Sequence, residues 1–201
     1  MIGTGGATEA SATGLILLTG GRGAGKTRLC REVAGWARAH GWEVAGLLSP
    51  ARFDGPDKIS IDVVDLRSGQ SRSLAHLRSR TADPVRTHTQ RWAFDDTAVA
   101  WGNDVLQQAA PCDLLVVDEF GPLELERGGG WTEGMAAVDA GVCRWALIVV
   151  RPELVSLALD RWPRAVILDV TDLEAAREHL RSLLFREPGA RSMRKTSFSG
   201  S

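Results

Sequence analysis

Residues 15–27 read LILLTGGRGAGKT, and the prediction of the fold begins from this stretch. An apolar run leads into a glycine-rich turn that ends in Gly25-Lys26-Thr27, and a helical pattern begins immediately afterwards. The spacing Gly20-x4-Gly25-Lys26-Thr27, between a strand and a helix, is that of a phosphate-binding loop (P-loop).

The glycines of such a loop permit backbone torsions that let consecutive N–H groups turn toward phosphate oxygens. The N-terminus of the following helix adds partial positive charge at the same place. We expect Lys26 to bridge the β- and γ-phosphates and the Thr27 hydroxyl to bind Mg2+. The expected nucleotide-binding residues are Gly20, Gly21, Arg22, Gly23, Ala24, Gly25, Lys26, Thr27 and Arg28.

Lysine is scarce in this chain, which makes a chance match to the motif improbable. The lysines are Lys26, Lys58 and Lys195, and one of them fills the single motif position that requires lysine. The alternative is a glycine-rich turn without a ligand, and the strand and helix on either side disfavour it.

Composition fits one globular domain of 201 residues with 44% hydrophobic content. We expect this domain to span 15–186, between a disordered lead-in (1–14) and a flexible tail (187–201). A net charge of −1 gives no electrostatic basis for binding nucleic acid. No apolar run approaches the ~20 residues of a membrane span, and the first residues do not resemble a signal peptide. The expected location is the cytoplasm.

The cysteines Cys30, Cys112 and Cys143 are odd in number and lack CxxC spacing. Neither a disulfide framework nor a zinc site is therefore predicted, and Cys112 is expected to be a small core residue. The four histidines are dispersed and form no ligand pattern.

Alternating strand and helix patterns predict an α/β doubly wound fold with a mostly parallel central sheet. Core strands are expected at 15–19, 44–48, 114–117, 147–150 and 166–168. Helices are expected at 28–40, 95–110, 131–140, 153–159 and 172–185. Polar–apolar alternation after residue 54 predicts a β-hairpin insertion at about 54–94, outside the doubly wound core.

A second motif follows the apolar run 113–117, where the predicted strand delivers Asp118-Glu119. Asp118 is placed to hold Mg2+, and Glu119 to orient or deprotonate an attacking water. Two acids that merely cap a strand are the alternative, which the P-loop upstream disfavours. A carboxylate beside the metal ligand favours hydrolysis over phosphotransfer, which needs a pocket that excludes water.

Residues 116–125, VVDEFGPLEL, resemble the signature of the THEP1-type nucleoside-triphosphatases, which are P-loop NTPases of the ASCE (RecA-like) type. The segment from Ala45 through the hairpin to Ala75, and the Gly102-Asn103 helix, are similar to corresponding segments of that family. The resemblance spans roughly 15–184. It departs from the family pattern at four places: Arg22, Arg28, Phe120 and the run 128–130.

This resemblance implies a sheet in which strand 147–150 lies between the strands that end at the two motifs, with core order 5-1-4-3-2. It also implies Mg2+-dependent hydrolysis of ATP, GTP and other NTPs to the diphosphate, with broad base preference. Gly20, Gly25, Lys26 and Thr27 would bind phosphate and metal. Asp118 would be the Mg2+ residue and Glu119 the catalytic carboxylate.

Further candidates lie near the motifs. Arg151 ends the strand predicted between them, where it would sense the γ-phosphate or pair with Glu153. Arg91 is a weaker nucleotide-facing candidate, and Trp92 or Trp131 would stack on a base. Glu124 and Glu126 would contact the metal or hold the loop after Asp118. The alternative, a solvated acidic turn, is favoured except that Glu124 belongs to the family-like signature.

The favoured function is a nucleoside-triphosphatase (a phosphoric anhydride hydrolase), with Lys26, Glu119 and Arg151 as its catalytic residues. One alternative is a phosphotransferase acting on a small molecule or nucleoside. Another is a nucleotide-gated accessory module that delivers a cofactor or solute. The expected partner is a nucleoside triphosphate, with no nucleic acid or membrane, while a protein partner or homo-oligomer is left open.

Overall fold

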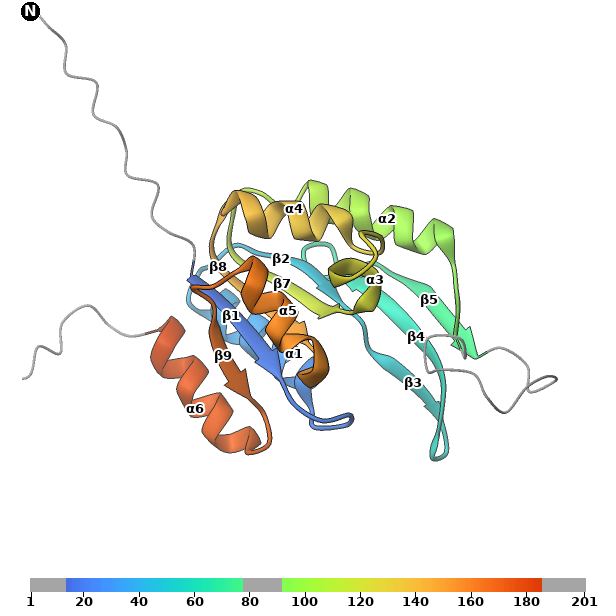
Figure 1. Cartoon of the computed structure of the whole chain (residues 1–201), viewed down its shortest axis with the longest axis horizontal. Coiled ribbons are helices and arrows are strands. Elements are labelled where there is room, and N and C mark those ends of the chain that lie inside the picture. The colour runs from blue at the N-terminus through green and yellow to red at the C-terminus, as the bar shows by residue number, and fades with distance from the viewer. Residues whose placement is uncertain (1–13, 78–91, 186–201) are drawn as a thin grey trace, which may run out of the picture.

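One mixed sheet of nine strands runs through the computed structural model, which describes residues 14–77 and 92–185 (Figure 1). The strands are β1 (Gly14–Thr19), β2 (Val44–Leu48), β3 (Ala51–Asp54), β4 (Asp57–Asp65), β5 (Ser71–Leu77), β6 (Trp92–Phe94), β7 (Cys112–Phe120), β8 (Cys143–Val150) and β9 (Val166–Asp169). The helices are α1 (Lys26–Ala39), α2 (Asp96–Gln107), α3 (Pro122–Leu125), α4 (Thr132–Ala140), the 3-10 helix η2 (Pro152–Leu154), α5 (Val155–Arg161) and α6 (Leu173–Leu184). The predicted tail, and the lead-in apart from Gly14, lie outside the described residues.

The parallel half of the sheet has the order β9-β1-β8-β7-β2. This is the predicted order 5-1-4-3-2, so that expectation is confirmed. Side chains alternate between two cores: Leu17 faces one and its neighbours Ile16 and Leu18 face the other, all fully buried. Parallel strands covered on both faces are expected to be apolar throughout, as these are.

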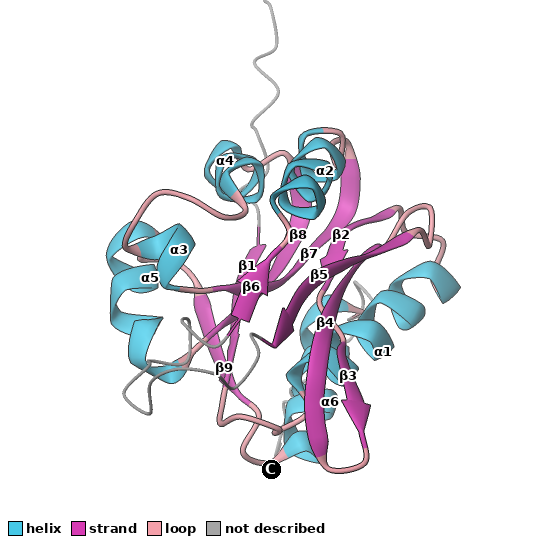
Figure 2. Cartoon of the chain, turned by 90° about the vertical axis from the view of Figure 1, so that its right-hand side faces the viewer, coloured by secondary structure: helices cyan, strands magenta, loops and turns pink. Residues whose placement is uncertain are grey.

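Helices cover the two faces unequally (Figure 2). Helices α2, α4 and α5 enclose one core, and α1 and α6 enclose the other. None of the helices among residues 14–77 and 92–185 is both long and apolar enough to cross a membrane.

The antiparallel half of the sheet contains the predicted hairpin, in which β4 pairs with β5, and it joins the parallel strands in one sheet. Strand β4 pairs antiparallel with β2, through Leu47↔Asp65 and Leu48↔Val64, and β3, β5 and β6 follow in the same sheet. The sheet is therefore mixed rather than purely parallel, with the predicted parallel strands in one half and antiparallel strands in the other. An unpaired outer edge on β2 would expose a row of backbone groups, and pairing with the end of β4 covers part of that row.

The predicted helix boundaries are confirmed where a capping residue defines them. The Asp95 carboxylate accepts hydrogen bonds from the backbone N–H groups of Thr97 and Ala98, and begins α2. Asp172 begins α6 in the same way, through the N–H of Ala175. The one-turn helix α3 is not among the helices predicted from the sequence.

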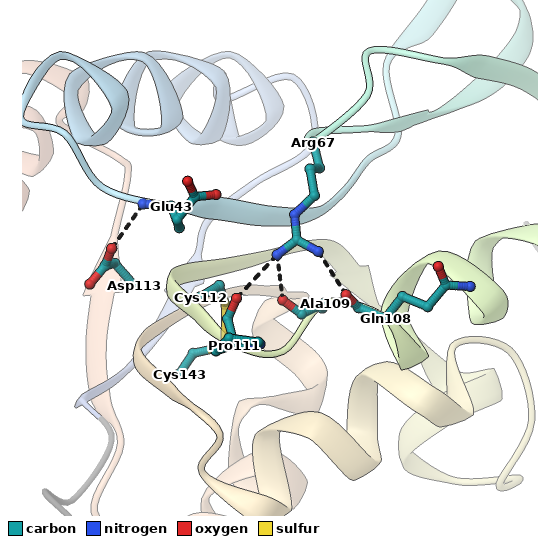
Figure 3. The surroundings of a disulfide bond; sticks show 8 residues. All are labelled: Glu43, Arg67, Gln108, Ala109, Pro111, Cys112, Asp113 and Cys143. Carbon is teal, nitrogen blue, oxygen red and sulfur yellow. Dashed lines mark hydrogen bonds between the residues drawn. A yellow bond between two sulfur atoms is a disulfide. The ribbon is translucent and has the colours of Figure 1, made fainter.

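A disulfide corrects the cysteine prediction (Figure 3). Cys112 and Cys143 open β7 and β8 and are direct partners across that parallel pair, which brings two residues 31 apart in sequence into bonding range. Cys112 is buried as expected, but it is cross-linked. The Arg67 guanidinium covers this edge by donating to the carbonyls of Gln108, Ala109 and Pro111.

Candidate active site

The P-loop lies between β1 and α1, and its geometry leaves the start of α1 open to an anion. Gly25 is the N-cap residue, with φ 92° and ψ 14°, a left-handed conformation that favours glycine. No side chain caps this helix, and its first turn contains no acidic residue. The amide groups and the positive end of the helix dipole are therefore not neutralised by α1 itself.

Lys26 is held across the loop by the loop's own backbone. Its Nζ donates to the carbonyl oxygens of Gly20 at 2.5 Å and Gly21 at 2.8 Å. A Cβ built at Gly21 or Gly23 would meet open space, so the surface above the loop is unobstructed there. The ammonium thus lies beside a space bounded by backbone, which suits a phosphate ligand.

Arg22 and Arg28, the two arginines predicted to bind nucleotide, have side chains in different surroundings. Arg22 is exposed at the loop tip. Arg28 Nε donates to Glu32 one turn along α1 at 2.9 Å, and its side chain is 74% exposed. Arg28 therefore has its backbone N–H, rather than its guanidinium, near the loop.

The acidic motif sits on a β-bulge. Val117 pairs with Ile148 and Phe120 pairs with Val150, so two residues of β7, Asp118 and Glu119, oppose one residue of β8. A bulge locally redirects side chains, and bulges are common beside active sites. The sequence pattern predicts the strand here but not this irregularity.

Asp118 connects three elements. Its side chain is buried, and its Oδ2 accepts from the backbone N–H of Ser49, just beyond β2, at 3.1 Å. Burial raises the pKa of Asp118, while the hydrogen bond from Ser49 and the nearby Thr27 side chain act to lower it. The acidic motif therefore lies beside the P-loop.

Glu119 is paired with Arg151. Arg151 Nε donates to Glu119 Oε1 at 2.5 Å, and the two side chains are about one-third exposed, at 37% and 32%. Arg151 follows β8 directly, as predicted, but its ion-pair partner is Glu119 and not Glu153. A guanidinium at this distance holds the carboxylate in one orientation.

Glu124 holds the loop after β7. Its two carboxylate oxygens accept from the backbone N–H groups of Gly121 at 2.7 Å and Trp131 at 3.0 Å. Burial raises the pKa of Glu124, and both hydrogen bonds oppose that rise. Of the readings considered for Glu124 (a metal contact, a residue that holds the loop, a solvated acidic turn), the structure therefore supports holding the loop.

Sequence reasoning missed Lys58, whose ammonium lies 5.1 Å from the centroid of the Trp92 ring. The chain has only three lysines, and this scarcity is the sequence signal that could have drawn attention to Lys58. Trp131 cannot be a base-stacking residue, because it is 5% exposed and packs in the core against Gly102. The candidate Arg91 lies outside the described residues.

The oxygen donors fit a magnesium ion held partly by substrate. Thr27 and Asp118 would contribute one hydroxyl and one carboxylate, which are oxygen ligands of the kind that Mg2+ prefers. Among residues 14–77 and 92–185 no cluster of three His, Cys, Asp or Glu side chains could bind a metal alone. Mg2+ commonly uses one or two protein oxygens together with phosphates and water.

Comparison of sequences reveals related proteins. The family model described as NTPase matches residues 15–129. The nucleoside-triphosphatase THEP1 of Methanopyrus kandleri is 30% identical over 126 residues, which are 62% of this chain and 67% of that protein. THEP1 of Caldivirga maquilingensis is 28% identical over 111 residues, covering 55% and 61%. The match to THEP1 of Ignicoccus hospitalis is 28% identical over 171 residues, covering 84% and 95%.

The match spans about three-fifths of the Caldivirga protein. Two solved structures share the fold. The solution structure of a human cancer-related nucleoside triphosphatase has a TM-score of 0.64 at 22% identity, covering 86% of this chain and 96% of the other. The crystal structure of THEP1 from Aquifex aeolicus has a TM-score of 0.62 at 16% identity, covering 86% and 99%. On the family match and these relatives, the chain belongs to the NTPase family of THEP1-type P-loop proteins.

Proposed function

We propose that this protein is a Mg2+-dependent nucleoside-triphosphatase that hydrolyses ATP, GTP and other NTPs to the diphosphate and phosphate. The observation that carries the proposal is the position of the buried Asp118 carboxylate beside the P-loop, where Thr27 and Lys26 both act to lower its pKa. This position brings the P-loop together with the end of a central strand 91 residues later, where the metal of a nucleotide–magnesium pair would lie. Family membership supports the same reaction, since several relatives carry the name nucleoside-triphosphatase.

The residues of this chain divide the work by position. The loop amides and Lys26 would bind the phosphates and stabilise the negative charge that develops on them during transfer. Thr27 and Asp118 would hold Mg2+, which withdraws charge from the phosphate oxygens when bound.

Glu119 would orient the attacking water and accept its proton. The bond from Arg151 engages Oε1, so Oε2 has the lone pairs for that water. The same bond fixes the carboxylate, which favours in-line attack on the terminal phosphate by holding water in one place. Arg151 would thus act on the water through Glu119 and, from the end of β8, contact the terminal phosphate.

Phosphate release from ATP, GTP, CTP and UTP, each with and without Mg2+, tests the proposal. We expect turnover with all four nucleotides in the presence of Mg2+ and a loss of at least about 100-fold in Lys26→Ala. Arg31→Ala removes an exposed positive charge elsewhere on α1 and should retain wild-type turnover.

The alternatives give different results in the same assay. A phosphotransferase would release phosphate poorly until an acceptor is added. An accessory module would turn over slowly until its partner is added. Phosphate release that Lys26→Ala leaves unchanged would contradict hydrolysis at this site.

A further inference from the structure

The antiparallel half of the sheet extends beyond the carboxyl ends of the parallel strands. Strand β4 pairs with β2 only through its last residues, Val64 and Asp65. Earlier residues of β4 pair instead with β3, which continues the chain past Leu48. Figure 1 shows the β3–β4 turn on the same lower side of the molecule as the loop that follows β1. The extension therefore reaches the edge where the P-loop and Asp118 lie.

Register shifts occur in both ladders of this extension, between Arg52 and Phe53 and between Ile61 and Asp62. Such irregularities bend a strand and redirect the side chains beside them. Lys58 lies beyond both shifts, near the start of β4. The extension is thus bent close to the place where it carries its lysine.

Lys58 is half-buried, and the Trp92 ring covers one side of its ammonium group at 5.1 Å. An aromatic face attracts a cation and orients it. A partly desolvated ammonium is unfavourable unless another group compensates its charge. The Trp92 ring compensates part of the positive charge of Lys58, and a phosphate oxygen would compensate the remainder.

The charges around Lys58 belong to the candidate active site. Burial lowers the pKa of Lys58 most, and the charges of Arg22 and Arg151 lower it further. The carboxylates of Glu119 and Asp118 act in the opposite direction. All four residues lie on the P-loop or at the ends of β7 and β8, so the ammonium is within electrostatic range of the site.

Strand order indicates which part of a nucleotide Lys58 would meet. The sequence of neighbours is β4-β2-β7-β8-β1, so β4 lies beyond β7 as seen from the P-loop. The terminal phosphate must point toward the end of β7, because Asp118 and Glu119 would serve its metal and its attacking water. A cation supplied by β4 therefore approaches the phosphate end of the nucleotide.

We propose that Lys58 binds the γ-phosphate, so that Lys26 and Lys58 hold it from opposite sides and Trp92 fixes the Lys58 ammonium. The inference deepens the proposed function and rests on it. A positive charge facing the transferred group stabilises its transition state, a task that other P-loop NTPases assign to an arginine. Here a lysine of the same chain would perform it.

Calorimetry with a non-hydrolysable ATP analogue and with ADP, both with Mg2+, tests this proposal. Lys58→Met removes the charge and keeps an apolar stem against Trp92. We expect it to weaken binding of the analogue by about tenfold, as loss of one charge-assisted hydrogen bond would, and binding of ADP by less than about twofold. Lys58→Arg should retain most of the preference for the triphosphate.

Arg72→Met is the matched control. Arg72 also lies over a tryptophan ring, 4.8 Å from the centroid of Trp101, but on β5 and toward α2. Its loss should leave both affinities unchanged. If Lys58→Met weakens both ligands equally, or neither, the γ-phosphate contact is overturned.

The analogue separates this inference from hydrolysis. Wild-type protein that prefers the triphosphate through Lys58 but releases no phosphate would support Lys58 and contradict the hydrolase. If the wild-type protein hydrolyses NTPs but Lys58→Met keeps the full preference for the triphosphate over ADP, the hydrolase is supported and the Lys58 contact is contradicted. Wild-type protein that binds neither nucleotide would overturn both.

Discussion

Adjacent carboxylates at the end of β7 have different surroundings, which suit them to different tasks. Asp118 is buried, and the hydrogen bond from the Ser49 N–H fixes its carboxylate close to Thr27. Glu119 is partly exposed and pairs with Arg151. A buried, fixed oxygen suits a metal ligand, whereas a carboxylate with solvent access can exchange a proton with water. The two residues also lie at the bulge in β7, where they oppose one residue of β8.

Glu119→Gln is expected to separate catalysis from binding. The amide keeps the size of the side chain but cannot accept a proton from water, so turnover should fall by at least about 100-fold. Affinity for a non-hydrolysable NTP should change by less than about twofold, because Glu119 would not contact the phosphates. Single-turnover phosphate release and calorimetry measure the two effects. Glu126→Gln, an exposed carboxylate in the following loop, is the control. Equal losses of binding and turnover in Glu119→Gln would contradict the assigned role.

At the scale of the element, the loop after β7 depends on one side chain. Glu124 lies on α3 and bonds both the start of that helix, at Gly121, and the start of the α4 segment, at Trp131. Gly130 makes this possible: it has φ 65°, and a Cβ there would lie 1.9 Å from Glu124 Oε1. Backbone conformation and the absence of a side chain are both required at that position.

The pair Gly128 and Gly130 isolates the contribution of Glu124. Both have φ near 65°, at 66° and 65°, but a Cβ at Gly128 meets open space. Gly128→Ala should cost about 1 kcal/mol of unfolding free energy from backbone strain alone. Gly130→Ala should cost about 1–3 kcal/mol more, because Glu124 must leave its partners, and it should also reduce turnover. Urea unfolding measures the difference, and equal losses in the two variants would contradict the clamp.

Helices and strands with local signals were predictable from sequence. Asp95 and Asp172 mark helix starts because each carboxylate satisfies backbone N–H groups within three residues. The P-loop is equally local. Helix α3 was not predictable, since one turn of helix carries little periodicity and its capping contacts come from Glu124 folding back on the chain. The bulge at Asp118 is invisible for a similar reason: it exists only relative to β8.

At the scale of the whole molecule, the two ends of the central strands carry different features. The carboxyl ends of β1, β7 and β8 bear the P-loop, the acidic motif and Arg151. The starts of β7 and β8, at the opposite end of the strands, bear the Cys112–Cys143 disulfide. This cross-link joins two neighbouring strands at one end, and the candidate active site lies at the other end.

Reduction of the disulfide should therefore lower stability without changing nucleotide affinity. Closing 31 residues into a loop restricts the unfolded chain, worth about 3–4 kcal/mol as an upper estimate. Thermal unfolding with and without dithiothreitol measures the loss, and calorimetry measures the affinity. The variant with both Cys112 and Cys143 replaced by alanine should not respond to reductant. A change of affinity on reduction in the native protein, with no change of stability, would contradict this division of the sheet.

Features that depend on contacts between distant parts of the chain could not be predicted from local sequence patterns alone. The order of the five parallel strands was predicted through the family resemblance and is confirmed. The disulfide was not predicted, because Cys112 and Cys143 become neighbours only when β7 and β8 pair. Lys58 was missed for the same reason: its position follows from β4 extending past β2, which sequence alternation does not specify.

The central claim is that a triphosphate–magnesium pair is held between the P-loop and the end of β7. The most direct test is the affinity of a non-hydrolysable NTP, with and without Mg2+, in wild-type protein and in Asp118→Asn. We predict that Mg2+ tightens binding to the wild-type protein by at least about tenfold and has little effect on Asp118→Asn, which keeps an oxygen for Ser49 but loses the charge that holds the metal. Equal enhancement by Mg2+ in both proteins, or no nucleotide binding by the wild type, would contradict the claim.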